Sequence, residues 1–512
     1  MKIGIISENG KIPLYFVKAL IQLKCNRAIS VILLYTPKED NELRTPFFKI
    51  YKKIDGYISK NPQLEYSVTE FKKAFGENIG EFELSGIDKK EYFDIILAPS
   101  SHYHAYETFS KRGVWYFEFG KYEMMSGLYE MYSGKNEIEI KLKADKNSKY
   151  ELETLVEPVN IYSLASFTLQ VYSKGAELLL SAFEKEVFSN ISISERVHKT
   201  FTPSFLLMNI KVIFRITQRI LDRLFYKYQW ILLVKTQDIG TKVEEYSPLN
   251  TPNSVFQADP FIVEDNGKHW IFFEELNFIE NKGYLCVGEL IEGRKLSESV
   301  KILEKEQHLS YPNVFLYQGC YYMIPETSGN RTIELYRATQ FPFQWEFVQV
   351  LIDDICAADT NVVFREDHIY LFTSIKNSEE GGFNDNLMIY YSKELFSTQW
   401  QAHQNNPVKI GALHSRCGGA LFEKENQLYR VAQDCCGQYG RKMCVFLVKE
   451  LTPSVYVEDF EYEIAPISKK YIGAHTLSIN SKYVVIDGLR KKRNSVKDIL
   501  NISMKAIKKV VK

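Results

Sequence analysis

The C-terminal half of the chain repeats one pattern five times, with a period of about 50 residues. In each copy a position is followed eleven places later by an aromatic or apolar residue: Asp259 and Trp270, Tyr311 and Tyr322, Asp359 and Tyr370, Gly418 and Tyr429, Gly473 and Val484. One small β-sheet cannot bury both of its faces, so repeats of this length stack on their neighbours. Five copies predict an all-β, five-bladed propeller over residues 229–488, with one end of every blade around a central funnel.

Each repeat is predicted to begin with a β-hairpin. In the first copy, Asn266-Gly267 lies between two alternating apolar runs, which is a strong hairpin signal. Symmetry about that turn places Asp259 opposite Glu274. The same arithmetic predicts four further pairs: Tyr311 with Glu326, Asp359 with Ser374, Gly418 with Gln433, and Gly473 with Gly488. We expect these ten positions to ring one mouth of the funnel.

The predicted ring is rich in acids, because Asp259, Glu274, Glu326 and Asp359 come from three consecutive repeats. Carboxylates that share a site split their pKa values, so an acid and a base can coexist at neutral pH. Glycosyl chemistry needs such a pair. We therefore predict Asp259, Glu326 and Asp359 as catalytic. The predicted substrate-binding residues are Glu274, Tyr311, Asn313, Arg416, Gln433, Asp434 and His475.

Structural roles are the alternative for several of these residues. Asp259 precedes Pro260, a common turn element, and Asp359 can cap a strand. A lone histidine such as His475 is often structural. Arg416 can bind a substrate anion or pair with a funnel carboxylate. A ring of this kind can also hold a glycan or a partner protein without chemistry.

Residues 1–195 alternate strand and helix signals, beginning with the apolar run KIGIIS. This pattern predicts an α/β domain with an open, mostly parallel, Rossmann-type sheet. Ligands of such sheets bind beyond the carboxyl ends of strands, here near Ser7 to Gly10 and Pro99 to His104. The chain has no GxGxxG and no GxxxxGK[ST], so we predict no dinucleotide or P-loop site.

Two basic segments flank the predicted propeller. Residues 196–228 contain a predicted helix over 203–228, along which basic residues recur every fourth position: Lys211, Arg215, Arg219, Arg223 and Lys227. This helix is either a connector between domains or an interfacial helix on anionic lipid. The tail, residues 489–512, carries nine Lys or Arg from Arg490 onward and one acid. It is either a membrane-surface element or a solvated end.

Composition and motif spacing argue against a nucleic-acid partner and against a metal site. Lys plus Arg equals Asp plus Glu at 64 each, and no aromatic residue lies among the tail charges, so no nucleic-acid partner is predicted. The eight cysteines show no CxxC and no zinc spacing, so no metal site is predicted. The start lacks signal-peptide anatomy, and no apolar run reaches about 18 residues. We expect a cytoplasmic protein, with peripheral attachment to the inner membrane face as an open alternative.

Several motifs in order carry a resemblance: QADPF, SYPNVF, YYMIPET, AADTNVVF, SRCGGALF and LYRVAQDCCGQYG. Residues 235–488 resemble the propeller domain at the N-terminal side of plant glucosamine inositolphosphorylceramide transferases and their bacterial relatives. That domain is similar to five-bladed glycoside hydrolases of the arabinanase and β-xylosidase type. The resemblance implies that Asp259 corresponds to the first-blade base of those hydrolases, and that the position of their second-blade Asp falls near Asn313 in this chain.

Residues 1–195 resemble the formyltransferase domain, through FDIILAPSS, RGVWYFEFG and VNIYSLASFTLQVY. Where that family carries Asn-x-His, this chain has Tyr116-Phe117-Glu118. Formyl transfer needs an imidazole at that place, so neither folate binding nor formylation is expected. The remaining alternative is a formyltransferase acting on an amino sugar with a relocated base, such as His102 or His104.

The function predicted from the sequence is therefore glycosyl transfer in surface polysaccharide or glycolipid biosynthesis, with a carbohydrate or lipid-linked glycan as partner. No cofactor is predicted, and a nucleotide-sugar donor is compatible with this reading. The alternative is a propeller that binds a glycan or a protein without catalysis.

Overall fold

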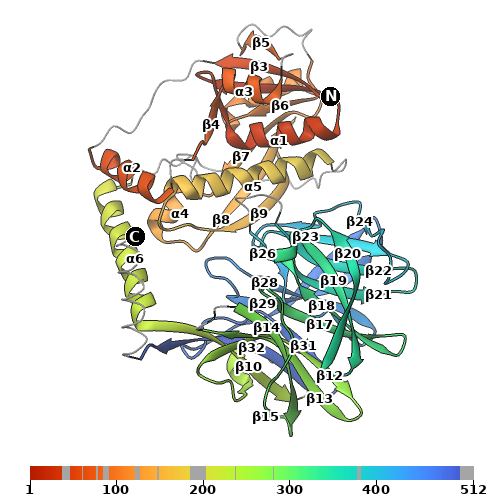
Figure 1. Ribbon diagram of the computed structural model, residues 1–512. Helices are drawn as coiled ribbons and strands as arrows, with labels where there is room; N and C mark the ends of the chain where they lie inside the picture. Colours follow the sequence, from red (N-terminus) through yellow and green to blue (C-terminus); the bar gives the residue numbers. More distant parts are fainter. Residues whose placement is uncertain are drawn as a thin grey trace. The chain divides into compact units, whose positions relative to one another are not determined.

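The computed structural model describes residues 1–512 except 37–45, 60–61, 77–78, 85–91, 122–126, 147–148, 185–202, 237, 279, 281, 377–381 and 496–512. The chain forms two compact units, Met1–Gln218 and Arg219–Lys512. Figure 1 shows an α/β first unit and an all-β second unit. Among the described helices, none combines the length and the apolar composition that crossing a bilayer requires.

The first unit contains a mixed sheet. Its strands are β1 (Lys2–Glu8), β2 (Lys11–Pro13), β3 (Ser30–Thr36), β4 (Glu65–Ser67), β5 (Gly80–Glu83), β6 (Ile95–Ala98), β7 (Val114–Phe119), β8 (Glu137–Asp145) and β9 (Lys149–Pro158). The order β5-β3-β1-β6-β7 is parallel throughout, whereas β2, β4, β8 and β9 pair antiparallel to their neighbours. The predicted α/β composition of this unit is thus confirmed. The sheet is mixed rather than mostly parallel, because four of the pairings between its described strands are parallel and four are antiparallel.

The helices of this unit are α1 (Leu14–Asn26), α2 (Pro46–Ser59), α3 (Val68–Phe75), α4 (Leu128–Ser133), α5 (Leu164–Glu184) and a 3₁₀ segment, η2 (Ser101–Phe109). Sequence signals set some of their ends. For example, α3 begins at a capping box, in which Ser67 accepts from the Glu70 backbone and Glu70 accepts from the Ser67 backbone. The central strands are apolar on both faces and form the core of the unit.

Helix α6 (Phe205–Phe225) lies within the range predicted for a helix. The tail prediction is wrong at its start, because residues 489–493 belong to strand β32 (Tyr483–Arg493). Strand β32 pairs with β10 (Tyr226–Thr236) over eleven positions, and residues 489–493 are part of that pairing. Residues 496–512 of the predicted tail lie outside the described residues.

In the described residues, five sheets form the second unit. Blade one holds β12 (Val255–Asp265), β13 (Lys268–Asn277), β14 (Lys282–Ile291), β15 (Lys295–Leu296) and β16 (Val300–Leu303). Blade two holds β17 (Ser310–Tyr317), β18 (Cys320–Glu326), β19 (Thr332–Gln340) and β20 (Gln344–Asp353). Blade three holds β21 (Ala357–Phe364), β22 (Ile369–Ile375), β23 (Asn386–Ser392), β24 (Gln401–Ala402) and β25 (Lys409–Ile410). Blade four holds β26 (Leu413–Cys417), β27 (Phe422–Lys424), β28 (Gln427–Asp434), β29 (Lys442–Leu451) and β30 (Tyr456–Ile464).

The fifth blade joins both ends of the unit and closes the ring. It contains β31 (Leu477–Ile479), β32, β10 and β11 (Ser247–Pro248), so strands before blade one complete a sheet begun after blade four. Five apolar clusters each span a pair of neighbouring blades, including the pair formed by blades five and one. The predicted five-bladed propeller is confirmed by this topology, in which every blade buries both faces.

The hairpin turns follow the sequence, but the register beyond them does not. Asn266 and Gly267 both have positive φ, 48° and 75°, as the Asn-Gly signal predicts. Further along, β12 carries a bulge, and Ala258 rather than Asp259 pairs with Glu274. The prediction of an Asp259–Glu274 pair is therefore wrong by one residue.

The pairs predicted for the other four repeats are also wrong in register. Bulges make Ser310 the partner of Glu326 and Ala358 the partner of Ser374. In blade four, Gly418 donates its N–H to Val431 rather than facing Gln433. In blade five, Gly473 bridges Leu489 rather than Gly488. A bulge adds one residue to one strand, and symmetry about a turn cannot detect that addition.

Candidate functional site

Three bulged residues in consecutive blades share one backbone conformation. Asp259, Tyr311 and Asp359 have φ values of 52°, 50° and 53°. A non-glycine residue in this left-handed region is strained and occurs mostly where the surrounding structure fixes it. All three residues are buried. Because the bulge recurs at one level of the ring, Asp259 and Asp359 contribute carboxylates from blades one and three to the same region.

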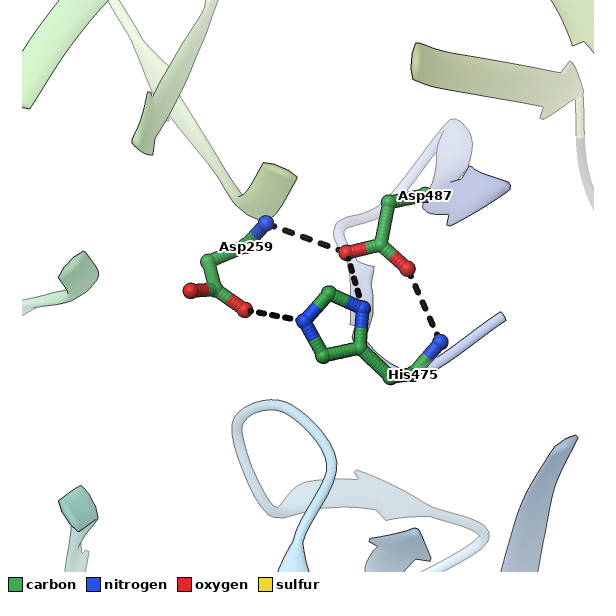
Figure 2. Close-up of side chains that lie close together, drawn as sticks. All are labelled: Asp259, His475 and Asp487. Carbon is green, nitrogen blue, oxygen red and sulfur yellow. Dashed lines mark hydrogen bonds and ion pairs between the residues drawn. The ribbon is translucent and has the colours of Figure 1, made fainter. Parts of the chain in front are cut away.

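Asp259 belongs to a buried charged triad with His475 and Asp487 (Figure 2). His475 Nε2 lies 3.2 Å from Asp259 Oδ1, and His475 Nδ1 lies 2.7 Å from Asp487 Oδ2. Thr476 Oγ1 also donates to Asp259 Oδ1 at 2.7 Å, and the Asp259 backbone N–H donates to Asp487 Oδ2 at 3.1 Å. These bonds join blades one and five. The other carboxylate oxygen of Asp259 is turned away from the imidazole (Figure 2).

The triad fixes the protonation of its members. Burial alone would lower the pKa of His475, but Asp487 and Asp259 outweigh burial and raise it to about 10. Burial alone would raise the pKa of Asp259, but the charge and hydrogen bond of His475 outweigh burial and lower it. At neutral pH the site therefore holds an imidazolium between two carboxylates, and Asp259 stays ionised.

The three residues could also be read as metal ligands, because one ligand atom from each lies within 4.8 Å of the others. Each ring nitrogen, however, faces its own carboxylate. A single cation would contact only one of these nitrogens, whereas a protonated ring serves both carboxylates. The geometry therefore fits an imidazolium better than a metal centre.

Arg416 connects the acids of blades two and three. Its Nε lies 2.6 Å from Asp359 Oδ2 and one terminal nitrogen lies 3.3 Å from Oδ1, a bidentate pair. The same guanidinium lies 3.8 Å from Glu326 Oε2. Gln433 donates to Asp359 Oδ2 at 3.0 Å and to the Cys417 carbonyl. Of the two roles considered for Arg416, the structure shows pairing with carboxylates.

Glu326 differs from Asp259 in its protonation. Burial and the nearby Asp359 carboxylate raise the pKa of Glu326 to about 7, even though Arg416 and a 2.8 Å hydrogen bond from Ser328 act in the opposite direction. The side chain is 13% exposed. Glu326 can therefore carry a proton at neutral pH, whereas Asp259 does not.

Glu274 has a partner that the sequence did not suggest, His308. Gly283 donates its backbone N–H to His308 Nδ1 at 3.1 Å, which places the ring proton of the neutral form on Nε2, 2.9 Å from Glu274 Oε1. Burial raises the pKa of Glu274 to about 7 despite this bond. A side chain at Gly283 would lie 2.6–2.7 Å from atoms of His308 and Glu274, so the close approach requires glycine.

Tyr439, in the loop between β28 and β29, is a second residue that sequence reasoning missed. Tyr439 is 40% exposed, and its ring lies 5.0 Å from the Arg416 guanidinium carbon and meets the His475 ring edge-on at 5.2 Å. Trp230 covers His475 on another side at 4.1 Å. An exposed aromatic ring beside carboxylates can stack on a sugar face. The adjacent glycines in the sequence GQYG were the available signal.

Tyr311 and Asn313 belong to a buried network rather than to an exposed rim. The Tyr311 hydroxyl accepts from Gly419 N–H at 2.8 Å and from Asn361 at 3.0 Å, and Asn313 donates to the Thr360 carbonyl at 3.0 Å. These bonds join blades two, three and four. Their burial favours a structural role over the predicted substrate-binding role.

Tyr311→Phe tests that role. The change strands the buried Gly419 N–H and one Asn361 N–H, so we expect the free energy of unfolding to fall by about 1–3 kcal/mol. Chemical denaturation of the full chain measures it. Tyr429→Phe, which removes an exposed hydroxyl bonded to Gln427, should change stability little. An equal effect of both changes would contradict the structural assignment.

Asp434, predicted as a substrate-binding residue, is buried and bonded to other residues of its own blade. Arg441 donates to its Oδ2 at 2.5 Å, Lys442 lies 3.7 Å away, and the Cys436 backbone donates to Oδ1 at 2.9 Å. These bonds hold the loop that carries Tyr439. Asp434 thus stabilises the loop that positions Tyr439 beside Arg416 and His475.

In the first unit, the two strand ends predicted to bind a ligand lie together. Tyr103, after β6, donates to Glu8 at the end of β1 at 2.8 Å. Tyr116 donates to Asp145 at 3.4 Å, and Glu118 pairs with Lys143 at 2.8 Å. No imidazole lies among these contacts. His102 and His104 are exposed in η2.

Comparison with known proteins covers the propeller. Residues 244–475 match the family model described as glucosamine inositolphosphorylceramide transferase 1, N-terminal. Two proteins named glucosamine inositolphosphorylceramide transferase 1 are similar over 208 residues: the rice (japonica) protein at 36% identity and the Arabidopsis thaliana protein at 33%. The aligned region is 40% of this chain but only 28% and 27% of those proteins. The family resemblance predicted from the sequence is confirmed.

Several glycoside hydrolases are among the solved structures with a similar arrangement. They include a family 117 enzyme of Zobellia galactanivorans, with 12% identity, a TM-score of 0.35, and coverage of 52% of this chain and 91% of that one. An α-L-arabinanase of Cellvibrio cellulosa shows 11% identity, a TM-score of 0.33, and coverage of 44% and 94%. The propeller assignment rests on the strand topology described above.

Proposed function

We propose that this chain transfers a sugar in glycolipid biosynthesis, with chemistry at the carboxylates of the propeller. One observation carries the proposal: the pKa values of two buried carboxyl groups in neighbouring blades are pushed in opposite directions. Asp259 is held ionised by His475, and Glu326 has a pKa of about 7. Environments that push two carboxyl pKa values apart are typical of acid–base pairs. The names of the plant relatives, glucosamine inositolphosphorylceramide transferases, support a lipid-linked acceptor.

In the proposed reaction, the acceptor hydroxyl attacks the anomeric carbon of the donor sugar. Asp259 takes the hydroxyl proton on its second oxygen, the new C–O bond forms, and the bond to the leaving oxygen breaks. Glu326 gives its proton to that leaving oxygen. Arg416 and Asp359 set the charge around Glu326, and Tyr439 stacks on a sugar ring. Asp259 and Glu326 are our proposed reactive carboxylates, and Asp359, predicted as catalytic from the sequence, is proposed instead as a positioning residue that acts through Arg416.

The test is product formation by the full chain. Labelled nucleotide sugars and labelled glycosides are offered with inositol-containing sphingolipids, and labelled glycolipid is measured. We expect transfer by the wild-type chain and none by Asp259→Asn/Glu326→Gln. Glu461→Gln, at an exposed position of β30, is the matched control. Unchanged transfer by the double variant would exclude this acid–base pair.

A binding module is the second candidate, because Asp259 and Asp359 are both engaged in short ion pairs. A protein of this kind would bind a glycan without turning it over. Glycan binding by the wild-type chain with no product from any donor would favour this candidate over transfer.

For the first unit we propose ligand binding near the β1 and β6 ends without formyl transfer. Tyr116 and Glu118 occupy the places where a formyltransferase carries Asn and His, and Lys143 pairs with Glu118. The formyltransferase resemblance of residues 1–195 stays a prediction. Turnover of formyl-tetrahydrofolate by the full chain would contradict our proposal.

A further inference from the structure

Helix α6 exposes its apolar side. Leu206, Ile210, Ile213 and Phe214 are 46%, 54%, 53% and 58% exposed, although α6 lies against the first unit. At 100° per residue these four positions lie on one side of the helix. Ile220 and Leu221 continue that side at 60% and 46% exposed. Soluble proteins rarely leave such a series of large apolar side chains in water without a partner.

The opposite side of α6 packs on protein and includes cations. Phe205, Met208 and Val212 are buried. Lys211 donates to the Tyr132 carbonyl at 2.9 Å, and Arg215 donates to the Met131 and Ile161 carbonyls at 3.1 and 3.2 Å. Two of these carbonyls lie at the end of α4, where the helix dipole favours a cation. Packing thus uses part of the basic stripe and leaves the apolar side outward, the reverse of an ordinary surface helix.

Helix α2 also exposes large apolar side chains, and it packs against α6. The Phe48 and Phe205 rings lie 4.7 Å apart, and Asn209 donates to the Phe47 carbonyl at 3.1 Å, so α2 and α6 pack together. Phe47 and Ile50 are 43% and 49% exposed. We call the exposed residues Phe47, Ile50, Leu206, Ile210, Ile213 and Phe214 the apolar ridge.

Charge indicates what covers the ridge. Helices α2 and α6 carry seven Lys or Arg and two Asp, in a chain whose charges balance overall. Lys49, Lys52 and Lys53 of α2 are exposed. A second copy of the chain, docked ridge to ridge, would bring two sets of cations together, which like-charge repulsion opposes. An anionic lipid surface accepts both the apolar side chains and the cations.

We propose that α2 and α6 dock this protein on an anionic lipid bilayer, with the apolar ridge inserted among the headgroups and the lysines of α2 facing lipid phosphates. The helices lie in the plane of the interface. The inference does not rest on the sugar-transfer proposal, because it requires no chemistry at the propeller.

Vesicle co-sedimentation of the full chain tests the proposal. We expect binding to vesicles of phosphatidylcholine mixed with phosphatidylglycerol, weaker binding to phosphatidylcholine alone, and loss in high salt. Ile210→Ser/Ile213→Ser/Phe214→Ser should weaken vesicle binding by at least about tenfold, because each change removes apolar surface that would be buried in the bilayer on binding. Lys49→Gln/Lys52→Gln/Lys53→Gln should weaken binding to the anionic vesicles selectively.

The matched control is Leu316→Ser/Phe347→Ser/Phe460→Ser. These propeller residues are 56%, 53% and 54% exposed, as the ridge residues are, and their replacement should leave vesicle binding unchanged. Thermal unfolding checks that each variant is folded. Equal binding by the ridge variant and the wild type would overturn the proposal, as would absence of wild-type binding. A dimer in sedimentation velocity that the ridge variant dissociates, without vesicle binding, would assign the ridge to a second copy instead.

Discussion

Glu326→Gln is expected to slow sugar transfer by about 10²–10⁴-fold when the donor leaves as a sugar alkoxide, the range that general acid catalysis supplies. Gln has the shape of Glu but no acidic proton, so the leaving oxygen would depart unprotonated. A donor that leaves as a nucleoside diphosphate needs little protonation, and its rate should fall much less. Comparison of the two donor types therefore measures the acid role directly.

The pH profile provides an independent readout. Burial and Asp359 raise the pKa of Glu326 to about 7, so the proton-carrying form declines as the pH rises through 7. The wild-type rate with an alkoxide-leaving donor should decline over the same range, and that decline should be missing from Glu326→Gln. Glu461→Gln should behave as the wild type does. Equal loss with both donor types would show that Glu326 does not act as the acid.

His475→Ala is expected to lower the free energy of unfolding by about 3–5 kcal/mol, the loss typical of removing one partner from a buried ion pair. The change leaves Asp259 and Asp487 buried without their shared cation. Adding Asp487→Asn should recover part of the loss, because it removes one of the two unpaired charges. Urea denaturation of the full chain measures each variant, and His368→Ala is the control. No recovery in the double variant would mean that packing, rather than charge, causes the loss.

The same triad predicts a pH dependence of stability. The pKa of His475 in the folded chain is about 10, above its ordinary 6.5, so its contribution is fully present below pH 6.5 and disappears as the pH rises through 10. The stability difference between the wild type and His475→Ala should therefore shrink across this interval. A difference that stays constant to pH 10 would contradict the imidazolium assignment.

Much of the propeller could be predicted from the sequence because the pattern is local. Turn residues such as Asn266-Gly267 and the alternation of apolar positions mark each hairpin, and the 50-residue period gives the number of blades. The α/β nature of the first unit followed in the same way, from apolar runs separated by helical segments. These signals depend only on neighbouring residues along the chain, so they can be recognised without the tertiary structure.

The site was predicted less completely. The acids of the first three repeats could be found from the sequence because their spacing recurs. The strand register next to them could not, since the left-handed bulge residues are Asp259 and Asp359 rather than glycines, which would have marked the bulges. The recurring ADP, SYP and ADT sequences at the three bulges were the available signal. Asp487, a lone acid within the apolar strand VVIDG, was another signal that went unused.

The sequence by itself determined the repeats, the turns and the supply of acids, since each depends on local chain chemistry. Only the tertiary structure decided which carboxyl pKa is lowered and which is raised toward neutral pH. A carboxyl pKa depends on burial and on charges within a few ångströms, and those charges come from other blades: His475 for Asp259, and Asp359 and Arg416 for Glu326. Ring closure brings these residues together across more than 200 positions of chain in the case of Asp259 and His475, a proximity that no local pattern encodes.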